Sequence, residues 1–179
     1  MTSHAFIDES VRGPNYCLCA TLVPGHGLAA ARSHMRSLLI SGQRRLHFAS
    51  ESPRRRKALL QDIAKIPCQS MIHVAIGGEQ VKARAAALES LMVELVDRNV
   101  ERIVLDSRQG QDHRDRVVIA RALGPDAGTD VQYQHLSSAS EPLLWIPDAV
   151  AWSWGRGGQW RSLIEEFGLL NGVEQTCLK

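Results

Sequence analysis

The stretch AFIDESVRGPNYCLCATLV, residues 5–23, decides the fold of this chain. An apolar run over residues 5–7 leads into the polar group Asp8-Glu9-Ser10, the turn residues Gly13-Pro14-Asn15 follow, and a second apolar run fills residues 16–23. Two apolar runs joined by a turn that contains glycine and proline are typical of a β-hairpin. We therefore expect the chain to open with an antiparallel hairpin whose first apolar run ends in an aspartate.

Helices and strands alternate along the rest of the chain. Apolar residues recur at helical spacing in several segments, and we expect helices at residues 28–40, 53–65, 79–99, 113–123, from about 147, and 160–167. Apolar runs predict further strands at residues 45–48, 70–76, 102–105 and 131–135. This order predicts an α/β fold, a mixed β-sheet flanked by helices that opens with an antiparallel hairpin. Either the strand at 70–76 or the strand at 102–105 can neighbour the first one, and only the second ends in an acid.

The composition is that of a globular domain. Of the 179 residues, 44% are hydrophobic and 22% are charged, which argues against a disordered or fibrous chain and fits one domain over residues 1–179. No apolar run approaches the roughly 18–20 residues of a membrane-spanning helix, and the first residues do not resemble a signal peptide. The four cysteines match neither a zinc motif nor a disulfide framework. We therefore expect a cytoplasmic protein with reduced cysteines and no membrane contact.

Positive charge is concentrated in one segment. Residues 32–57 hold eight Lys or Arg side chains against a single acid, Glu51, so this segment carries +7 while the whole chain carries +2. A basic surface of this kind attracts a polyanion such as nucleic acid; a solvated helix end and loop is the alternative. The candidate nucleic-acid-binding residues are Arg54, Arg55, Arg56, Lys57 and, farther along the chain, Arg108. The first four lie in the opening turns of a helix, where the dipole disfavours positive charge and a bound phosphate would explain it.

Three aspartates stand in apolar surroundings. Asp8 ends the run at 5–7, Asp106 ends the run at 103–105, and Asp148 lies within the apolar stretch 145–150. The carboxyl ends of neighbouring strands in an α/β sheet converge on one crevice, and a late helix packed across the sheet would add Asp148. Crowded carboxylates repel unless a divalent cation lies between them. The alternative is that each acid is a local turn or first-turn residue.

Four blocks of the sequence, in order, resemble the bacterial domain-of-unknown-function family 3800, which is assigned a ribonuclease H-like fold. The opening block is FIDES at residues 6–10, and the second joins LHF at 46–48 to Glu51 and the basic helix that follows. The third is IVLDSR at 103–108, and the closing block is LWIPDAVAW at 144–152. The resemblance covers most of the chain.

The resemblance implies a metal-dependent nuclease that hydrolyses phosphodiester bonds in DNA or RNA. Asp8, Asp106 and Asp148 would be the metal ligands for Mg²⁺ or Mn²⁺ and, with them, catalytic residues. Glu51 is the preferred fourth acid over Glu9, which should point to the opposite face of its strand. His47 would move protons or contact the scissile phosphate, although a structural, hydrogen-bonded histidine is an equal alternative.

Two other functions fit the same residues. One is a catalytically silent nucleic-acid-binding module that keeps the fold and its basic surface, with binding that falls as salt rises. The other is a defence-associated subunit that needs a protein partner, for which the terminal segment 163–170 would present an exposed apolar surface.

Overall fold

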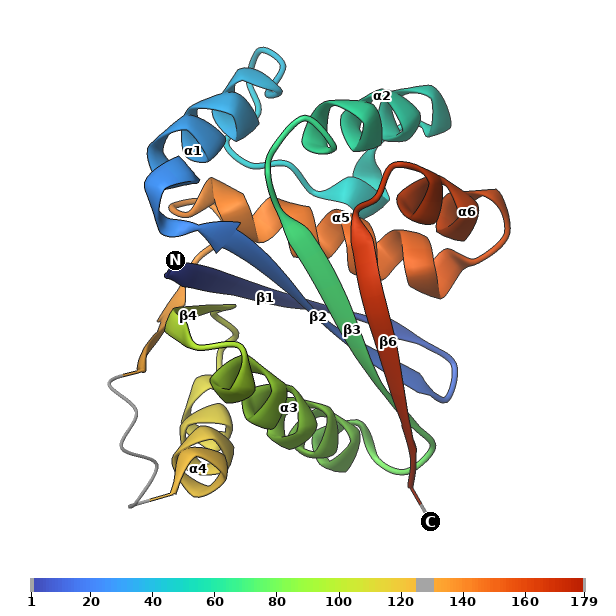
Figure 1. Cartoon of the computed structure of the whole chain (residues 1–179). Helices are drawn as coiled ribbons and strands as arrows, with labels where there is room; N and C mark the ends of the chain where they lie inside the picture. The colour runs from blue at the N-terminus through green and yellow to red at the C-terminus, as the bar shows by residue number, and fades with distance from the viewer. Residues whose placement is uncertain (1, 125–130, 179) are drawn as a thin grey trace.

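The computed structural model describes residues 2–124 and 131–178. Its centre is a six-stranded sheet with the order β5-β4-β1-β2-β3-β6 (Figure 1). The strands are β1 (Ser3–Arg12), β2 (Asn15–Pro24), β3 (Gln69–Ile76), β4 (Val100–Asp106), β5 (Gln132–Leu136) and β6 (Leu170–Cys177). The chain thus forms the mixed α/β sheet expected from its sequence.

Helices cover both faces of the sheet (Figure 1). One face carries α3 (Gln80–Asp97) and α4 (Asp112–Leu123), and the other carries α1 (Leu28–Ser37), α2 (Pro53–Ile63), α5 (Trp145–Arg156) and α6 (Gln159–Glu166). Short 3₁₀ turns occupy Gly25–Gly27, Phe48–Ser50 and Pro142–Leu144. Each face buries its own apolar core. Among the described residues, no helix has the length and apolar character needed to cross a bilayer.

The opening hairpin and its neighbours decide which residues meet. β1 pairs antiparallel with β2, which in turn pairs antiparallel with β3. On its other side β1 pairs parallel with β4, with Ile7 opposite Leu105. Of the two candidate neighbours of β1, the strand that ends in an acid is therefore the adjacent one. This register brings Asp8 and Asp106, each the next residue along its strand, to the same end of the sheet.

The alternation of side chains along β1 separates its two acids. Phe6 lies in the core under α5, whereas Ala5 and Ile7 lie in the core under α3. Successive strand residues point to opposite faces, so Asp8 continues the Phe6 side. Glu9 points to the α3 side, as the sequence predicts.

Two elements differ from the sequence-based expectations. The strand predicted at residues 45–48 is wrong, because residues 43–47 are irregular and a 3₁₀ turn begins at Phe48. Leu46 and Phe48 are both buried while their neighbours are exposed, and this alternation imitates a strand although the segment packs on helices. β6 was not predicted, because its residues are mostly exposed and Gly172 interrupts them.

Candidate active site

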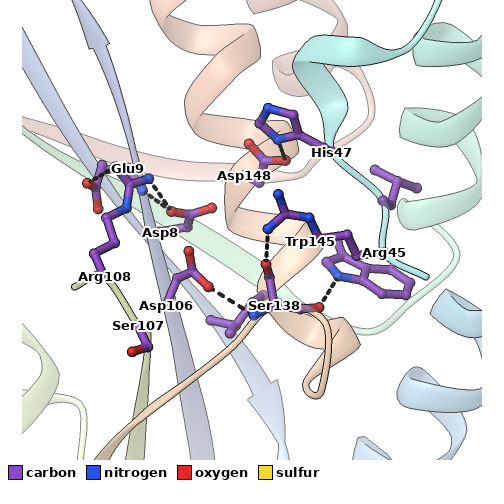
Figure 2. A pocket seen from close by; sticks show the side chains of 12 residues that line it. Asp8, Glu9, Arg45, His47, Asp106, Ser107, Arg108, Ser138, Trp145 and Asp148 are labelled. Carbon is purple, nitrogen blue, oxygen red and sulfur yellow. Dashed lines mark hydrogen bonds and ion pairs between the residues drawn. The ribbon is translucent and has the colours of Figure 1, made fainter. Parts of the chain in front are cut away.

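A pocket of about 300 Å³ lies where β1 and β4 end, beneath the first turn of α5 (Figure 2). The segment before the 3₁₀ turn at Phe48 and the loop after β5 complete its wall. The pocket is lined by Asp8, Glu9, Arg45, Leu46, His47, Asp106, Ser107, Arg108, Ser138, Leu144, Trp145 and Asp148. Four of the five expected catalytic residues, together with Arg108, therefore share one cavity.

Asp8 is the most deeply buried of the three aspartates and is only 7% exposed. Its Oδ1 atom accepts the backbone N–H of Glu9 at 2.8 Å, and the Arg108 guanidinium is 3.5 Å away. Burial raises the pKa of Asp8 well above its ordinary value, and the nearby charges of Asp148, Glu9 and Asp106 raise it further. The ionised form of Asp8 is therefore unfavourable unless a cation balances it.

Asp106 and Asp148 approach the same space from β4 and α5 (Figure 2). The Oδ1 atom of Asp106 accepts the backbone N–H of Ser138 at 3.0 Å, and burial raises the pKa of Asp106. The Oδ2 atom of Asp148 accepts the backbone N–H of Phe48 at 2.9 Å. Backbone amides thus hold these carboxylates in fixed orientations.

Each of the three aspartates keeps one carboxylate oxygen available. Within the described residues, Oδ2 of Asp8, Oδ2 of Asp106 and Oδ1 of Asp148 accept no hydrogen bond, while the other oxygen of each is bonded to a backbone amide. Carboxylate oxygens are the donors that Mg²⁺ and Mn²⁺ prefer. The chemical type of these donors therefore suits a hard divalent cation, although their oxygens do not all lie within 4.8 Å of one another.

His47 lies at the mouth of the pocket. Its Nδ1 atom is 3.5 Å from Oδ2 of Asp148, and its side chain is 54% exposed. The hydrogen bond with Asp148 raises the pKa of His47 above its ordinary value of 6.5, against the opposing effect of partial burial. The ring is thus available both to solvent and to a group bound in the pocket.

Basic residues border the acids. Arg108 pairs with Glu9 at 2.7 Å and reaches Asp8, and its side chain is half exposed. Arg45 donates to the hydroxyl of Ser138 at 3.1 Å, and the backbone carbonyl of Ser138 accepts the indole N–H of Trp145 at 2.7 Å. Arg45 and Ser138 were missed as site residues. The basic segment that contains Arg45 was the available signal, whereas nothing in the sequence marks Ser138.

A buried charge network supports the pocket from the α3 side. Arg84 donates to Asp115 at 2.7 and 2.8 Å, to the Tyr16 hydroxyl at 2.9 Å, and to Glu9. His135 lies 3.1 Å from Asp115. Burial opposes the charge of Asp115, but the hydrogen bonds from Arg84 and His135 outweigh it and lower the pKa of Asp115. Arg84 was also missed, although an arginine among the apolar positions of its helix is a usable signal.

Glu51 lies outside the pocket. Its carboxylate is buried, pairs with Arg55 at 2.7 Å, and accepts a hydrogen bond from Gln43 at 2.8 Å. The structure therefore brings together Asp8, Asp106, Asp148, His47 and Arg108 and does not bring Glu51 to them. Glu9, the other candidate for a fourth acid, borders the pocket from the α3 side of the sheet.

The basic run at the start of α2 divides into two kinds of residue. Arg54 and Lys57 are exposed. Arg55 binds Glu51 and the carbonyl of Leu38, and Arg56 donates to the carbonyls of Phe48 and Ala49 at 2.9 and 2.6 Å. These bonds explain why positive charge is tolerated in the first turn of this helix.

A second cluster of potential metal ligands lies away from the pocket. In the described part of the chain, one group of three or more His, Cys, Asp or Glu residues has ligand atoms all within 4.8 Å of one another, namely His73, Glu94 and Glu174. The three aspartates of the pocket are spread more widely. His73 is hydrogen-bonded to Ser90 at 2.9 Å and to Glu94 at 2.7 Å, and it lies 3.3 Å from Glu174. These contacts join β3, α3 and β6 without requiring a metal.

Comparison with known proteins shows the fold. The structure of the PCNA:RNase HII complex from Archaeoglobus fulgidus contains a similar chain, with a TM-score of 0.57, 19% sequence identity, and coverage of 93% of this chain and 78% of that chain. RNase H1 from the halophilic archaeon Halobacterium salinarum NRC-1 gives a TM-score of 0.40 and 17% identity, with coverage of 79% and 89%. No family model matches the sequence, and no curated protein does. Together with its sheet topology, the first likeness shows that the chain has a ribonuclease H-like fold, as expected from the sequence.

Proposed function

We propose that this protein is a metal-dependent nuclease that hydrolyses phosphodiester bonds in DNA or RNA, and that it belongs to domain-of-unknown-function family 3800. One observation carries the proposal. Three aspartates from β1, β4 and α5 each have one oxygen fixed by a backbone amide and one oxygen free, and all three line the same pocket. The ribonuclease H-like fold is consistent with this activity but does not by itself establish it.

The proposed metal ligands are Asp8, Asp106 and Asp148, with Mg²⁺ or Mn²⁺ as the cation. A bound cation would neutralise charge at the phosphate. It would also lower the pKa of a bound water, so that this water could act as a nucleophile at neutral pH. The raised pKa values of Asp8 and Asp106 support the proposal, because they show how unfavourable the ionised acids are when no cation is near.

The remaining residues of the pocket would handle the substrate. His47, exposed and bonded to Asp148, would hold or move a proton at its imidazole. Arg108 would turn its half-exposed guanidinium from Glu9 to a phosphate oxygen. Glu51 stays a prediction as the fourth acid, since its carboxylate is already bound to Arg55 and Gln43.

The proposed substrate is a nucleic acid, and Arg54, Arg55, Arg56 and Lys57 are proposed to contact it. A cytoplasmic location is part of the proposal. The structure contains the four cysteines as free thiols, and free thiols are typical of proteins in a reducing compartment.

A cleavage assay tests the proposal. Labelled single-stranded DNA, single-stranded RNA, duplex DNA and an RNA–DNA hybrid are incubated with the protein and Mg²⁺, Mn²⁺ or EDTA. We expect cleavage of at least one substrate with metal and none with EDTA, and a loss of about 100-fold or more in Asp106→Asn. Asp97→Asn, which removes an exposed carboxylate at the end of α3, should cleave like the wild type. Cleavage that persists in Asp106→Asn, or in EDTA, would contradict the mechanism.

A second candidate function rests on Arg108. Its guanidinium already lies beside Asp8 and Glu9, where it balances part of their charge without a metal. This arrangement favours a silent nucleic-acid-binding module of the same fold. Salt-dependent binding that is unchanged by EDTA and by Asp8→Asn, with no cleavage of any substrate, would identify this second function.

A further inference from the structure

Two arginines lie against one indole next to the pocket, and a third lies close enough to act on one of them. The guanidinium carbon of Arg56 lies 4.2 Å from the ring centroid of Trp152, and that of Arg12 lies 5.4 Å from it. Arg156, at the end of α5, acts electrostatically on Arg56, as Arg12 does. We call Arg12, Arg56 and Arg156 the arginine cluster. Its members come from β1, α2 and α5, so the fold, and not a local run of sequence, brings them together.

The arginine cluster is fixed relative to the three aspartates. Asp148 and Trp152 are four residues apart on α5, and Asp8 and Arg12 are four residues apart on the same side of β1. Phe48 links the two groups directly, because its N–H donates to Asp148 and its carbonyl accepts from Arg56. The cluster therefore continues the pocket along α5 and β1.

Gly155 allows the close approach that forms the arginine cluster. A Cβ atom at this position would lie 3.2 Å from Cγ of Arg12 and 3.5 Å from the hydroxyl of Ser10. Without a side chain there, β1 packs tightly against the last turn of α5. Arg12 consequently lies along the helix toward Trp152.

In the described part of the chain, no carboxylate forms an ion pair with the arginine cluster, and Glu51 acts on Arg56 only at longer range. Among the described residues, no acidic oxygen lies within 4.0 Å of the nitrogens of Arg12, Arg56 or Arg156. Partial burial and the neighbouring charge of Arg156 lower the pKa of Arg56. Like charges held together in this way form a site for an anion.

We propose that the arginine cluster binds the phosphate backbone of a nucleic-acid strand a few nucleotides away from the bond in the acidic pocket. The inference rests on the proposed function, because it takes the pocket as the place of cleavage. Asp148 and Arg156 are about 12 Å apart along the helix axis, which corresponds to roughly three to four nucleotides at about 3.4 Å each. Trp152 is only 8% exposed, so its ring holds the arginines and does not stack on bases. Binding here is therefore independent of base sequence.

Binding of oligonucleotides in EDTA tests the inference without requiring cleavage. The probe is a fluorescein-labelled 20-nucleotide single strand, DNA or RNA, followed by fluorescence anisotropy at several salt concentrations. The test variant is Arg12→Gln with Arg156→Gln. The control is Arg114→Gln with Arg116→Gln, which removes the same charge from exposed positions of α4 on the other face of the sheet.

We expect the test variant to bind about 10-fold more weakly than the wild type at about 0.1 M salt. The slope of log affinity against log salt concentration is negative, and it should become shallower by about 1.4, because two phosphate contacts on a single strand are lost. The α4 control should bind like the wild type. Arg12→Lys with Arg156→Lys should restore most of the affinity, because it restores the charge.

The inference would be overturned by a test variant that binds as tightly as the control, or by a wild-type protein that binds neither single strand. Thermal unfolding of each variant shows whether weaker binding reflects a damaged fold, and binding that the lysine variant does not restore would also count against the inference. Because all of these arms are run in EDTA, failure of the cleavage assay is distinguishable from failure of the arginine cluster.

Discussion

The backbone N–H of Phe48 donates to Oδ2 of Asp148 at 2.9 Å, across 100 residues of sequence. This bond connects the segment before α2 to the first turn of α5. It orients the Asp148 carboxylate and places His47 3.5 Å from the same oxygen. The irregular segment at residues 43–47 is therefore a wall of the pocket.

The bond between His47 and Asp148 predicts a shift in titration. We expect Asp148→Asn to lower the pKa of His47 toward 6.5, because the hydrogen bond with Asp148 is the main cause of its increase. Titration of the imidazole resonances by NMR in EDTA measures this, with His26 as the internal control. An unchanged pKa of His47 would show that the pair is not formed in solution.

Asp8 should destabilise the metal-free protein. Its pKa is raised in the folded state, so the folded protein disfavours the ionised form of Asp8. The resulting loss of stability is absent below the unfolded pKa near 3.8 and grows as the pH rises above it. Asp8→Asn should therefore be more stable than the wild type at pH 7 in EDTA, with the difference shrinking toward pH 4. Urea unfolding at several pH values measures this, and Asp97→Asn should show no such gain. A less stable Asp8→Asn at pH 7 would contradict the electrostatic account.

Arg84 should matter far more to stability than a surface arginine. Its side chain is 4% exposed and binds both Asp115 and Glu9. Arg84→Met leaves these acids buried without a partner, which costs about 3–5 kcal/mol. Arg98→Gln breaks an exposed pair with Glu94 and should cost less than about 1 kcal/mol. Urea unfolding compares the two, and equal losses would mean that the buried network adds little.

Asp115 should make the protein sensitive to acid. Its pKa is lowered in the folded state, so its contribution is fully present above the unfolded pKa near 3.8 and is lost as the pH falls below that value. The difference in unfolding free energy between the wild type and Asp115→Asn should therefore mostly disappear in strong acid. Unfolding free energies of both proteins between pH 2 and pH 6 test this; a constant difference would contradict it.

The sequence predicted those parts of the fold that bury apolar side chains in regular patterns. The hairpin at 5–23 and the strand at 102–105 are such cases, and their ends carry Asp8 and Asp106. β6 has no such pattern, because it pairs at the edge of the sheet with most side chains exposed. Residues 45–48 were misassigned because helices, rather than a neighbouring strand, bury Leu46 and Phe48.

The candidate site was predictable where a strand ends in an acid, as for Asp8 and Asp106, and where an acid stands in an apolar helical stretch, as for Asp148. Glu51 illustrates the limit, since its nearness to His47 in sequence suggested the pocket while a local pair with Arg55 holds it elsewhere. Arg84 binds Glu9 from α3, and Arg45 binds Ser138 from an irregular segment. Both contacts depend on packing between distant parts of the chain. The arginine cluster likewise depends on three separate elements.

Metal binding measured by thermal unfolding tests the central claim most directly, because a ligand of the native state raises its stability even without substrate. Wild type, Asp8→Asn, Asp106→Asn and Asp97→Asn are compared with and without millimolar Mn²⁺. The account predicts a higher unfolding temperature with Mn²⁺ in the wild type and in Asp97→Asn, and no increase in the two pocket variants. An increase that survives in both Asp8→Asn and Asp106→Asn, or its absence from the wild type, would contradict a metal site formed by these aspartates.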